Sequence, residues 1–162
     1  MAGQAVNPAA LPALFRRQFE LCQVRRGETV ILLTDFNTRR DYVQSCFAAA
    51  ADLGAHAYEI GVSRSPDWLR IGVDVVGEAK GMQQALVQGD MIVAFHPPNF
   101  SNWQKQVRAA GGRVMSIADA PDVLARLISP PGLKPAVLHA SKRWGSADRK
   151  STRLNSSHAN IS

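Results

Sequence analysis

Short apolar segments that suit buried β-strands alternate with helical patterns along this chain. The clearest strand is residues 29–34 (TVILLT), where a continuous, partly β-branched apolar run suits a strand covered on both faces. Further strands are predicted at 55–60, 91–95 and 113–117. Because a helical pattern separates each strand from the next, the sequence predicts an α/β fold: a Rossmann-like parallel sheet of about four strands with helices on both faces.

The helical patterns show apolar residues at intervals of three and four. Helices are predicted at residues 11–24, 41–53, 77–87, 100–110 and 121–128, with a last one over 133–144. Glycines close behind several of these patterns predict where the helices stop, Gly27 for the first and Gly54 for the second. Residues 61–74 mix loop residues with large apolar ones and fit neither pattern well.

The chain has the length and composition of one globular domain. It has 162 residues, of which 46% are hydrophobic, so residues 1–147 can bury a core without help from a metal or a disulfide. Cys22 and Cys46 lie within helical patterns and have no CxxC partner. We therefore expect them to be small buried apolar residues, not metal ligands.

The final segment, residues 148–162 (DRKSTRLNSSHANIS), resembles a translated sequencing adapter over its whole length. We expect this tail to be non-native and the protein to be truncated after residue 147. The alternative is a natural polar terminus. Tail residues Arg149, Lys150 and Arg153 also contribute to the net charge of +6, so the basic character is partly theirs.

Three scattered pairs of basic residues remain outside the tail, and they have no interleaved aromatic residues. They are Arg16 with Arg17, Arg25 with Arg26, and Arg39 with Arg40. A solvated surface explains such pairs better than a nucleic-acid interface, which needs charge gathered on one face. We find no signal peptide and no apolar run long enough to span a membrane, so the cytoplasm is the expected compartment and no membrane partner is expected.

The carboxyl edge of an open α/β sheet is where ligands usually bind, so the loops after the strands hold the candidate site. Residues 34–39 follow the first strand and contain no glycine, which argues against a GxGxxG or P-loop phosphate site. Asp35 and Asn37 fit helix caps better than ligands, because these residue types are preferred N-caps. Arg39 follows in the same loop.

His96 follows the third strand on the same predicted edge. Without a neighbouring carboxylate or second histidine, a loop histidine bonded to backbone is the better interpretation. No HExxH, GxSxG or paired His-carboxylate pattern occurs, so no catalytic residue and no metal ligand is assigned. If the chain is instead a self-contained binding module, its small ligand is expected at Asp35, Arg39 and His96.

Three segments together resemble a known superfamily. Leu14 and Phe15, followed by Cys22 and the V-x-x-G-E-x-V turn of residues 24–30, resemble the opening of the aminopeptidase T-like metalloenzymes, often named leucyl aminopeptidases. Residues 42–58 are similar to their next helix and strand. Residues 120–127 (APDVLARL) resemble the 2,5-dihydroxypyridine 5,6-dioxygenase branch of the same superfamily.

The resemblance implies a Rossmann-like N-terminal domain that carries no metal ligands. In this superfamily a C-terminal domain binds either a divalent metal pair, in the peptidases, or iron(II) held by two histidines and a carboxylate, in the dioxygenases. We therefore expect a non-catalytic fragment without its own cofactor, whose partners are the missing catalytic domain and further copies of itself. An apolar surface over 133–144 would indicate a severed interface, and a polar one an independent module.

Overall fold

The computed structural model describes residues 7–63, 76–77, 79–96 and 101–128. The chain divides into two compact units, Met1–Ile128 and Ser129–Ser162, and every described residue belongs to the first. The predicted helix at 133–144 and the tail at 148–162 lie outside the described residues, as does most of the ambiguous segment at 61–74.

Strands and helices alternate through the first unit in the predicted order. A short 3-10 helix, η1, precedes five α-helices and four strands: η1 (Pro8–Ala10), α1 (Leu11–Leu21), β1 (Thr29–Thr34), α2 (Arg40–Asp52), β2 (His56–Gly61), α3 (Lys80–Val87), β3 (Met91–Ala94), α4 (Asn102–Ala109), β4 (Arg113–Ser116) and α5 (Pro121–Ile128). None of the helices in this part of the chain is long and apolar enough to cross a membrane.

The four strands form one parallel sheet in the order β2-β1-β3-β4. Ile31 at the centre of β1 lies opposite Tyr58 of β2 on one side and Ile92 of β3 on the other. The chain builds outward from β1 to β2 and then returns to place β3 on the opposite side of β1. This reversal leaves the carboxyl ends of β1 and β3 beside each other, which is where open α/β sheets usually form a crevice.

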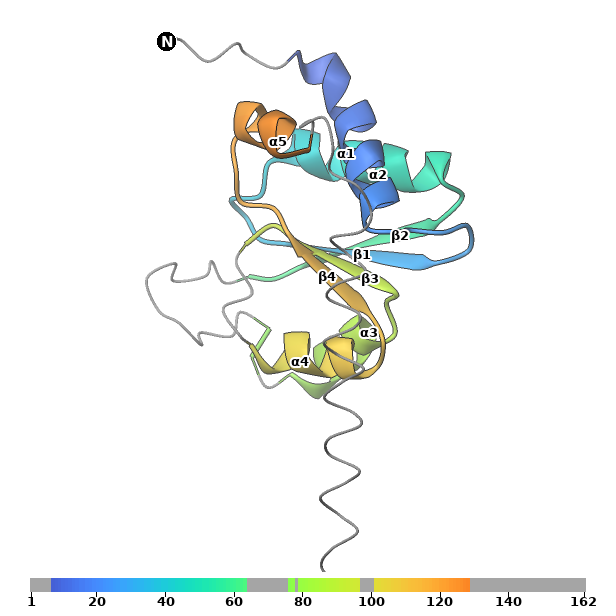
Figure 1. Ribbon diagram of the computed structural model, residues 1–162. Coiled ribbons are helices and arrows are strands. Elements are labelled where there is room, and N and C mark those ends of the chain that lie inside the picture. Colours follow the sequence, from blue (N-terminus) through green and yellow to red (C-terminus); the bar gives the residue numbers. More distant parts are fainter. Residues whose placement is uncertain (1–6, 64–75, 78, 97–100, 129–162) are drawn as a thin grey trace, which may run out of the picture. The chain divides into compact units, whose positions relative to one another are not determined.

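The helices cover both faces of the sheet, and the predicted α/β class is confirmed (Figure 1). Helices α1, α2 and α5 lie on one face, and α3 and α4 lie on the other. Successive β1 residues alternate between the two cores, because side chains along a strand point to opposite faces. Val30 and Leu32 pack with α1 and α2, whereas Ile31 and Leu33 pack with Leu86 and Trp103 on the other side.

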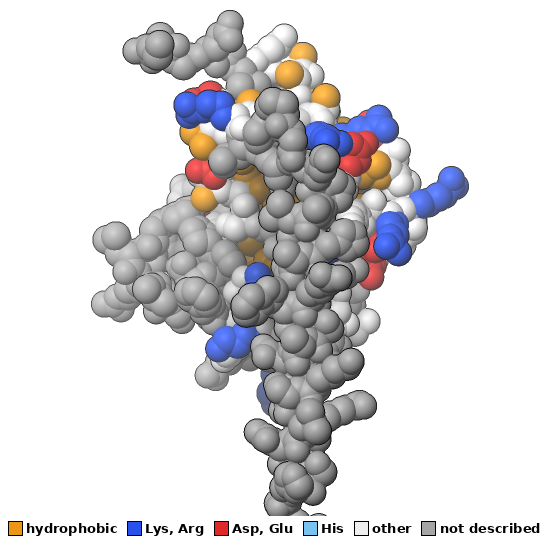
Figure 2. Space-filling model, viewed as in Figure 1, with side chains coloured by type: hydrophobic (Ala, Val, Ile, Leu, Met, Phe, Trp, Pro, Cys, Tyr) orange, Lys and Arg blue, Asp and Glu red, His pale blue; other side chains and the backbone are white. Residues whose placement is uncertain are grey.

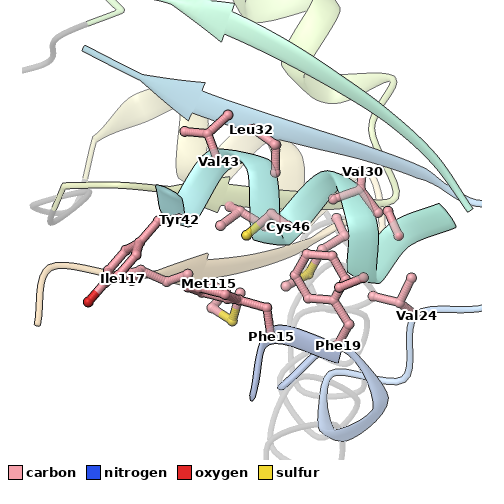
Figure 3. Packing of buried hydrophobic residues seen from close by; sticks show 14 of the residues in the cluster. Phe15, Phe19, Val24, Val30, Leu32, Tyr42, Val43, Cys46, Met115 and Ile117 are labelled. Atoms are coloured by element: carbon pink, nitrogen blue, oxygen red, sulfur yellow. The ribbon is translucent and has the colours of Figure 1, made fainter. Parts of the chain in front are cut away.

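The larger core joins α1 and α2 to β1 and β4 (Figure 3). Phe15 and Phe19 of α1 are fully buried in it, as is Cys46 of α2. Burial raises the pKa of the Cys46 thiol, so this side chain behaves as the expected small apolar residue. Cys22 is only half-buried, and its Sγ lies 3.8 Å from Met115 Sδ.

Two predicted helix boundaries were wrong, because backbone conformation departs from the side-chain pattern. Helix α3 begins at Lys80 and not at 77, since Gly77 has a left-handed φ of +63°. Helix α1 ends at Leu21 and not at 24. Its terminating left-handed residue is Gln23, with φ of +57°, and the Val24 N–H donates to the Phe19 carbonyl at 2.9 Å in a Schellman turn.

Replacing Gln23 with glycine is expected to raise the free energy of unfolding by about 0.5–1 kcal/mol. A left-handed conformation costs an L-residue about 1–2 kcal/mol, and the greater backbone entropy of glycine in the unfolded chain offsets only part of that gain. Urea unfolding followed by far-UV circular dichroism measures the change. Gln44→Gly, an exposed site within α2, is the matched control and should lower stability by about 1 kcal/mol. Equal losses in both variants would contradict the prediction.

Candidate ligand site at the carboxyl edge of the sheet

A hollow of about 140 Å³ opens at the carboxyl edge of the sheet. We call it the edge hollow and define it by the residues that line it: Asp35, Asn37, Thr38, Arg39, Tyr42, Phe95, Ile117, Ala118 and Asp119. These residues come from the loop after β1, the first turn of α2, and the segments that directly follow β3 and β4. The edge hollow therefore lies where the reversal of the sheet predicts a crevice.

The loop after β1 is held together by Asp35. Its Oδ1 accepts from the Asn37 N–H at 2.9 Å and from the Thr38 hydroxyl at 3.0 Å, while the Asp35 N–H donates to Thr38 Oγ1 at 2.9 Å. The expectation that Asp35 and Asn37 cap the following helix was wrong. The N-cap of α2 is Arg39, which makes no side-chain cap bond, because the Asp35 carboxylate closes its own turn several residues earlier.

Arg39 contributes its guanidinium to one rim of the edge hollow. Its Nε and Nη2 donate to the two carboxylate oxygens of Asp41 at 3.1 and 2.6 Å. The guanidinium carbon also lies 4.9 Å from the centre of the Tyr42 ring. These bonds hold the pKa of Asp41 below its usual value. The charge of Arg39 is therefore already matched within the protein.

Tyr42 connects the edge hollow to the core. Its side chain is buried, its hydroxyl donates to the Asp119 carbonyl at 2.9 Å, and its ring meets Phe15 edge-on with centroids 5.2 Å apart. Burial is the main cause that raises the pKa of Tyr42 to about 12, so the phenol stays protonated at neutral pH. Tyr42 thus acts as a fixed anchor between α2 and the segment after β4, beside Ile117 (Figure 3).

Two of the three residues predicted to bind a ligand meet in the edge hollow, Asp35 and Arg39. His96 is buried at the end of β3, and its carbonyl accepts from the Ser116 hydroxyl at 3.0 Å. Its neighbour Phe95 lines the edge hollow, and His96 itself does not.

Several lining residues were missed from the sequence, among them Tyr42, Phe95 and Asp119. Phe95 and Ile117 are the last residues of predicted strands, and residues 118–119 follow directly, so the carboxyl-edge rule could have found them. Tyr42 carries no such signal, because it lies on the apolar stripe of a helix.

A metal site requires several donors in one place. In the described ranges, no three or more His, Cys, Asp or Glu side chains gather as a metal would need. The donors available in this part of the chain therefore do not fit the iron(II) or the divalent metal pair that the superfamily uses.

Comparison with known families identifies the chain. The family NicX, 2,5-dihydroxypyridine 5,6-dioxygenase, matches residues 10–158. The chain belongs to this dioxygenase family. The superfamily resemblance expected from residues 14–30, 42–58 and 120–127 is thereby confirmed.

A solved relative of the NicX family supports the fold. The structure of 2,5-dihydroxypyridine dioxygenase from Pseudomonas putida KT2440 has a TM-score of 0.69 and 23% sequence identity, covering 77% of this chain and 38% of that one. Two structures of VinN, one in complex with L-aspartate and one without, have TM-scores of 0.45 and 0.47 at 16% identity, covering 75% of this chain and 28% and 26% of theirs. No curated protein matches the sequence. The chain spans little more than a third of the dioxygenase.

Proposed function

We propose that this chain is the N-terminal, non-catalytic domain of a metal-dependent dioxygenase that opens the ring of hydroxylated pyridines. The observation that carries the proposal is the NicX family match over residues 10–158 of a chain that covers only 38% of the related dioxygenase structure. The absence of a metal-donor group among the described residues supports placing the reactive centre elsewhere in the parent protein.

In the parent, the metal would activate dioxygen and substrate for ring opening, and iron(II) is the proposed ion. The domain described here would contribute a rigid wall to the cleft and contacts between subunits. A leucyl aminopeptidase-like hydrolase with a divalent metal pair is the other branch of the superfamily. We favour the dioxygenase because the matched family carries that activity in its name.

The chain of 162 residues is expected to show no ring-opening activity by itself. The test incubates it with iron(II), dioxygen and 2,5-dihydroxypyridine and follows oxygen uptake and loss of the substrate absorbance. A full-length parent, recovered from an independent sequencing library, is the positive control, and a leucine anilide tests the peptidase branch. Turnover by the chain alone, or tight stoichiometric iron binding to it, would refute the proposal. If the parent hydrolyses the anilide, the parent belongs to the peptidase branch.

The same library tests the proposed origin of residues 148–162. If this tail derives from an adapter, the recovered gene should diverge from it near residue 148 and continue into a further domain. A gene that encodes the same tail and then stops would contradict truncation. The proposal also includes association with that further domain, self-association, and a location in the cytoplasm.

We also propose that the domain does not bind nucleic acid. Four of its paired arginines have acidic neighbours: Arg16 and Arg17 lie within 3.6 Å of Glu20 carboxylate oxygens, Arg39 binds Asp41, and Arg40 binds Glu59. On the face shown in Figure 2, basic and acidic side chains are interspersed, which is the pattern of a solvated surface.

A second candidate function is binding of a small ligand by this domain itself. The edge hollow favours it, because the hollow lies at the carboxyl ends of three parallel strands and brings Asp35 and Arg39 together. Binding by the chain, measured without any enzymatic assay, tests this candidate independently of the dioxygenase proposal.

A further inference from the structure

We propose that the edge hollow binds a small organic cation, an amine or a protonated nitrogen ring no larger than about one ring. The inference rests on the second candidate function, binding of a small ligand by this domain, and names the class of that ligand. Three properties of the hollow support it: its size, the apolar side chains within it, and the sign of the charges around it.

The size and the apolar part of the lining fit a compact hydrocarbon body. The edge hollow has a volume of about 140 Å³, and a cavity of about 150 Å³ is known to accept benzene. Phe95, Ile117 and Tyr42 supply apolar surface, and each is less than a tenth exposed. Because these side chains are packed into the core, their positions are fixed before any ligand arrives.

The charges around the edge hollow favour a cation. Asp35 and Asp119 line it, and the carboxylates of Asp41, Asp119 and Asp122 all act on Tyr42 to raise its pKa. Among the described residues, Arg39 is bound to Asp41, and Arg126 lies 3.5 Å from Asp122. Of the charged side chains that line the edge hollow, two are carboxylates and one is a guanidinium, in a chain whose net charge is +6.

An anionic ligand is disfavoured by the way Arg39 is used. Two of its donor nitrogens bind Asp41, and its planar face lies over Tyr42, so an anion would have to share a guanidinium whose charge a carboxylate already matches. A cation does not compete with Asp41 for Arg39. Asp35 uses one carboxylate oxygen to hold its loop, and a carboxylate has a second oxygen that can accept a bond from an ammonium or ring N–H.

A nuclear magnetic resonance titration of the full chain tests the inference. The probe is 4-aminopyridine, which is a flat cation at neutral pH. Phenol and benzoate are matched rings without charge and with negative charge. Saturable shifts are expected for the amides of residues 35–42 and 117–119 with 4-aminopyridine, and at least fivefold weaker effects with the other two rings.

Substitutions locate the binding site. Asp119→Asn is expected to weaken binding of 4-aminopyridine by about fivefold, whereas Asp52→Asn, the same charge change at an exposed site on α2, should leave it unchanged. Ala118→Leu fills the edge hollow without changing its charge and should abolish the shifts. Amide spectra of each variant report whether it folds.

Each outcome of the titration decides something. Equal binding of phenol and 4-aminopyridine would contradict the preference for a cation, but small-ligand binding by this domain would still hold. Stronger binding of benzoate would have the same meaning. Absence of shifts with all three rings would overturn both. None of these results bears on the dioxygenase proposal, which is measured by turnover of the parent.

Discussion

Replacing Phe15 with alanine is expected to lower the free energy of unfolding by about 4 kcal/mol and the midpoint temperature by roughly 10–20 °C. Phe15 is fully buried in the core between α1, α2 and the sheet, and its ring contacts Tyr42 edge-on. Removing the ring loses its transfer energy and leaves a cavity that this close-packed region can only partly refill. Urea unfolding of the full chain, followed by circular dichroism, measures the loss.

The matched control is Phe36→Ala. Phe36 is 74% exposed in the loop after β1, so the same chemical change should alter stability by less than about 0.5 kcal/mol. A loss below about 1 kcal/mol for Phe15→Ala would show that α1 does not pack as described. Because Phe15 supports Tyr42, we also expect the Phe15 variant to broaden the amide signals of residues 117–119 beside the edge hollow.

The order and type of the elements could be predicted because the signals are strong and local. The four central positions of the TVILLT run of β1 are apolar, which suits a strand buried on both faces. Pro121 begins α5 as predicted, since the first turn of a helix needs no N–H from proline. These features depend on a few neighbouring residues, so no knowledge of tertiary contacts is needed.

The missed end of α1 depends on a backbone conformation that residue type does not reveal. A glutamine at position 23 gives no signal for a left-handed turn, yet its conformation ends α1 and is stabilised by the hydrogen bonds of the turn. Asp35 has the residue type of a helix cap, but its carboxylate accepts hydrogen bonds within its own loop and does not cap α2. In both cases, two local structures compete for the same groups, and tertiary packing decides between them.

The candidate site was only partly predictable because sheet order brings its residues together. Asp35 and Arg39 could be found by following the first strand to its end. The contact of Tyr42 with Asp119 spans 77 positions and exists because β1, β3 and β4 are neighbours in that order. The hydrophobic pattern does not determine strand order, so the contact between Tyr42 and Asp119 could not be predicted from the sequence.

Arg113 is the first residue of β4 and lies at the amino edge of the sheet. Its guanidinium donates to the carbonyls of Cys22 and Gln23, at 2.7 Å for the first, and to the Glu28 carboxylate. Glu28 in turn accepts from the Arg25 N–H at 2.9 Å. One side chain of β4 thus satisfies the carbonyls at the end of α1 and orders the turn that leads into β1.

Arg113→Ala is therefore expected to lower the free energy of unfolding by about 2–3 kcal/mol, because it leaves a partly buried carboxylate and two carbonyls without their donor. The side chains of Arg113 and Glu28 are 29% and 22% exposed, so the pair is only weakly screened by solvent. Arg17→Ala, at a 57% exposed pair on α1, is the control and should change stability by less than about 0.5 kcal/mol. A double-mutant cycle with Glu28→Gln separates the ion pair from the carbonyl bonds. If Arg113→Ala and Arg17→Ala unfold at the same urea concentration, Arg113 does not hold the end of α1 against the sheet.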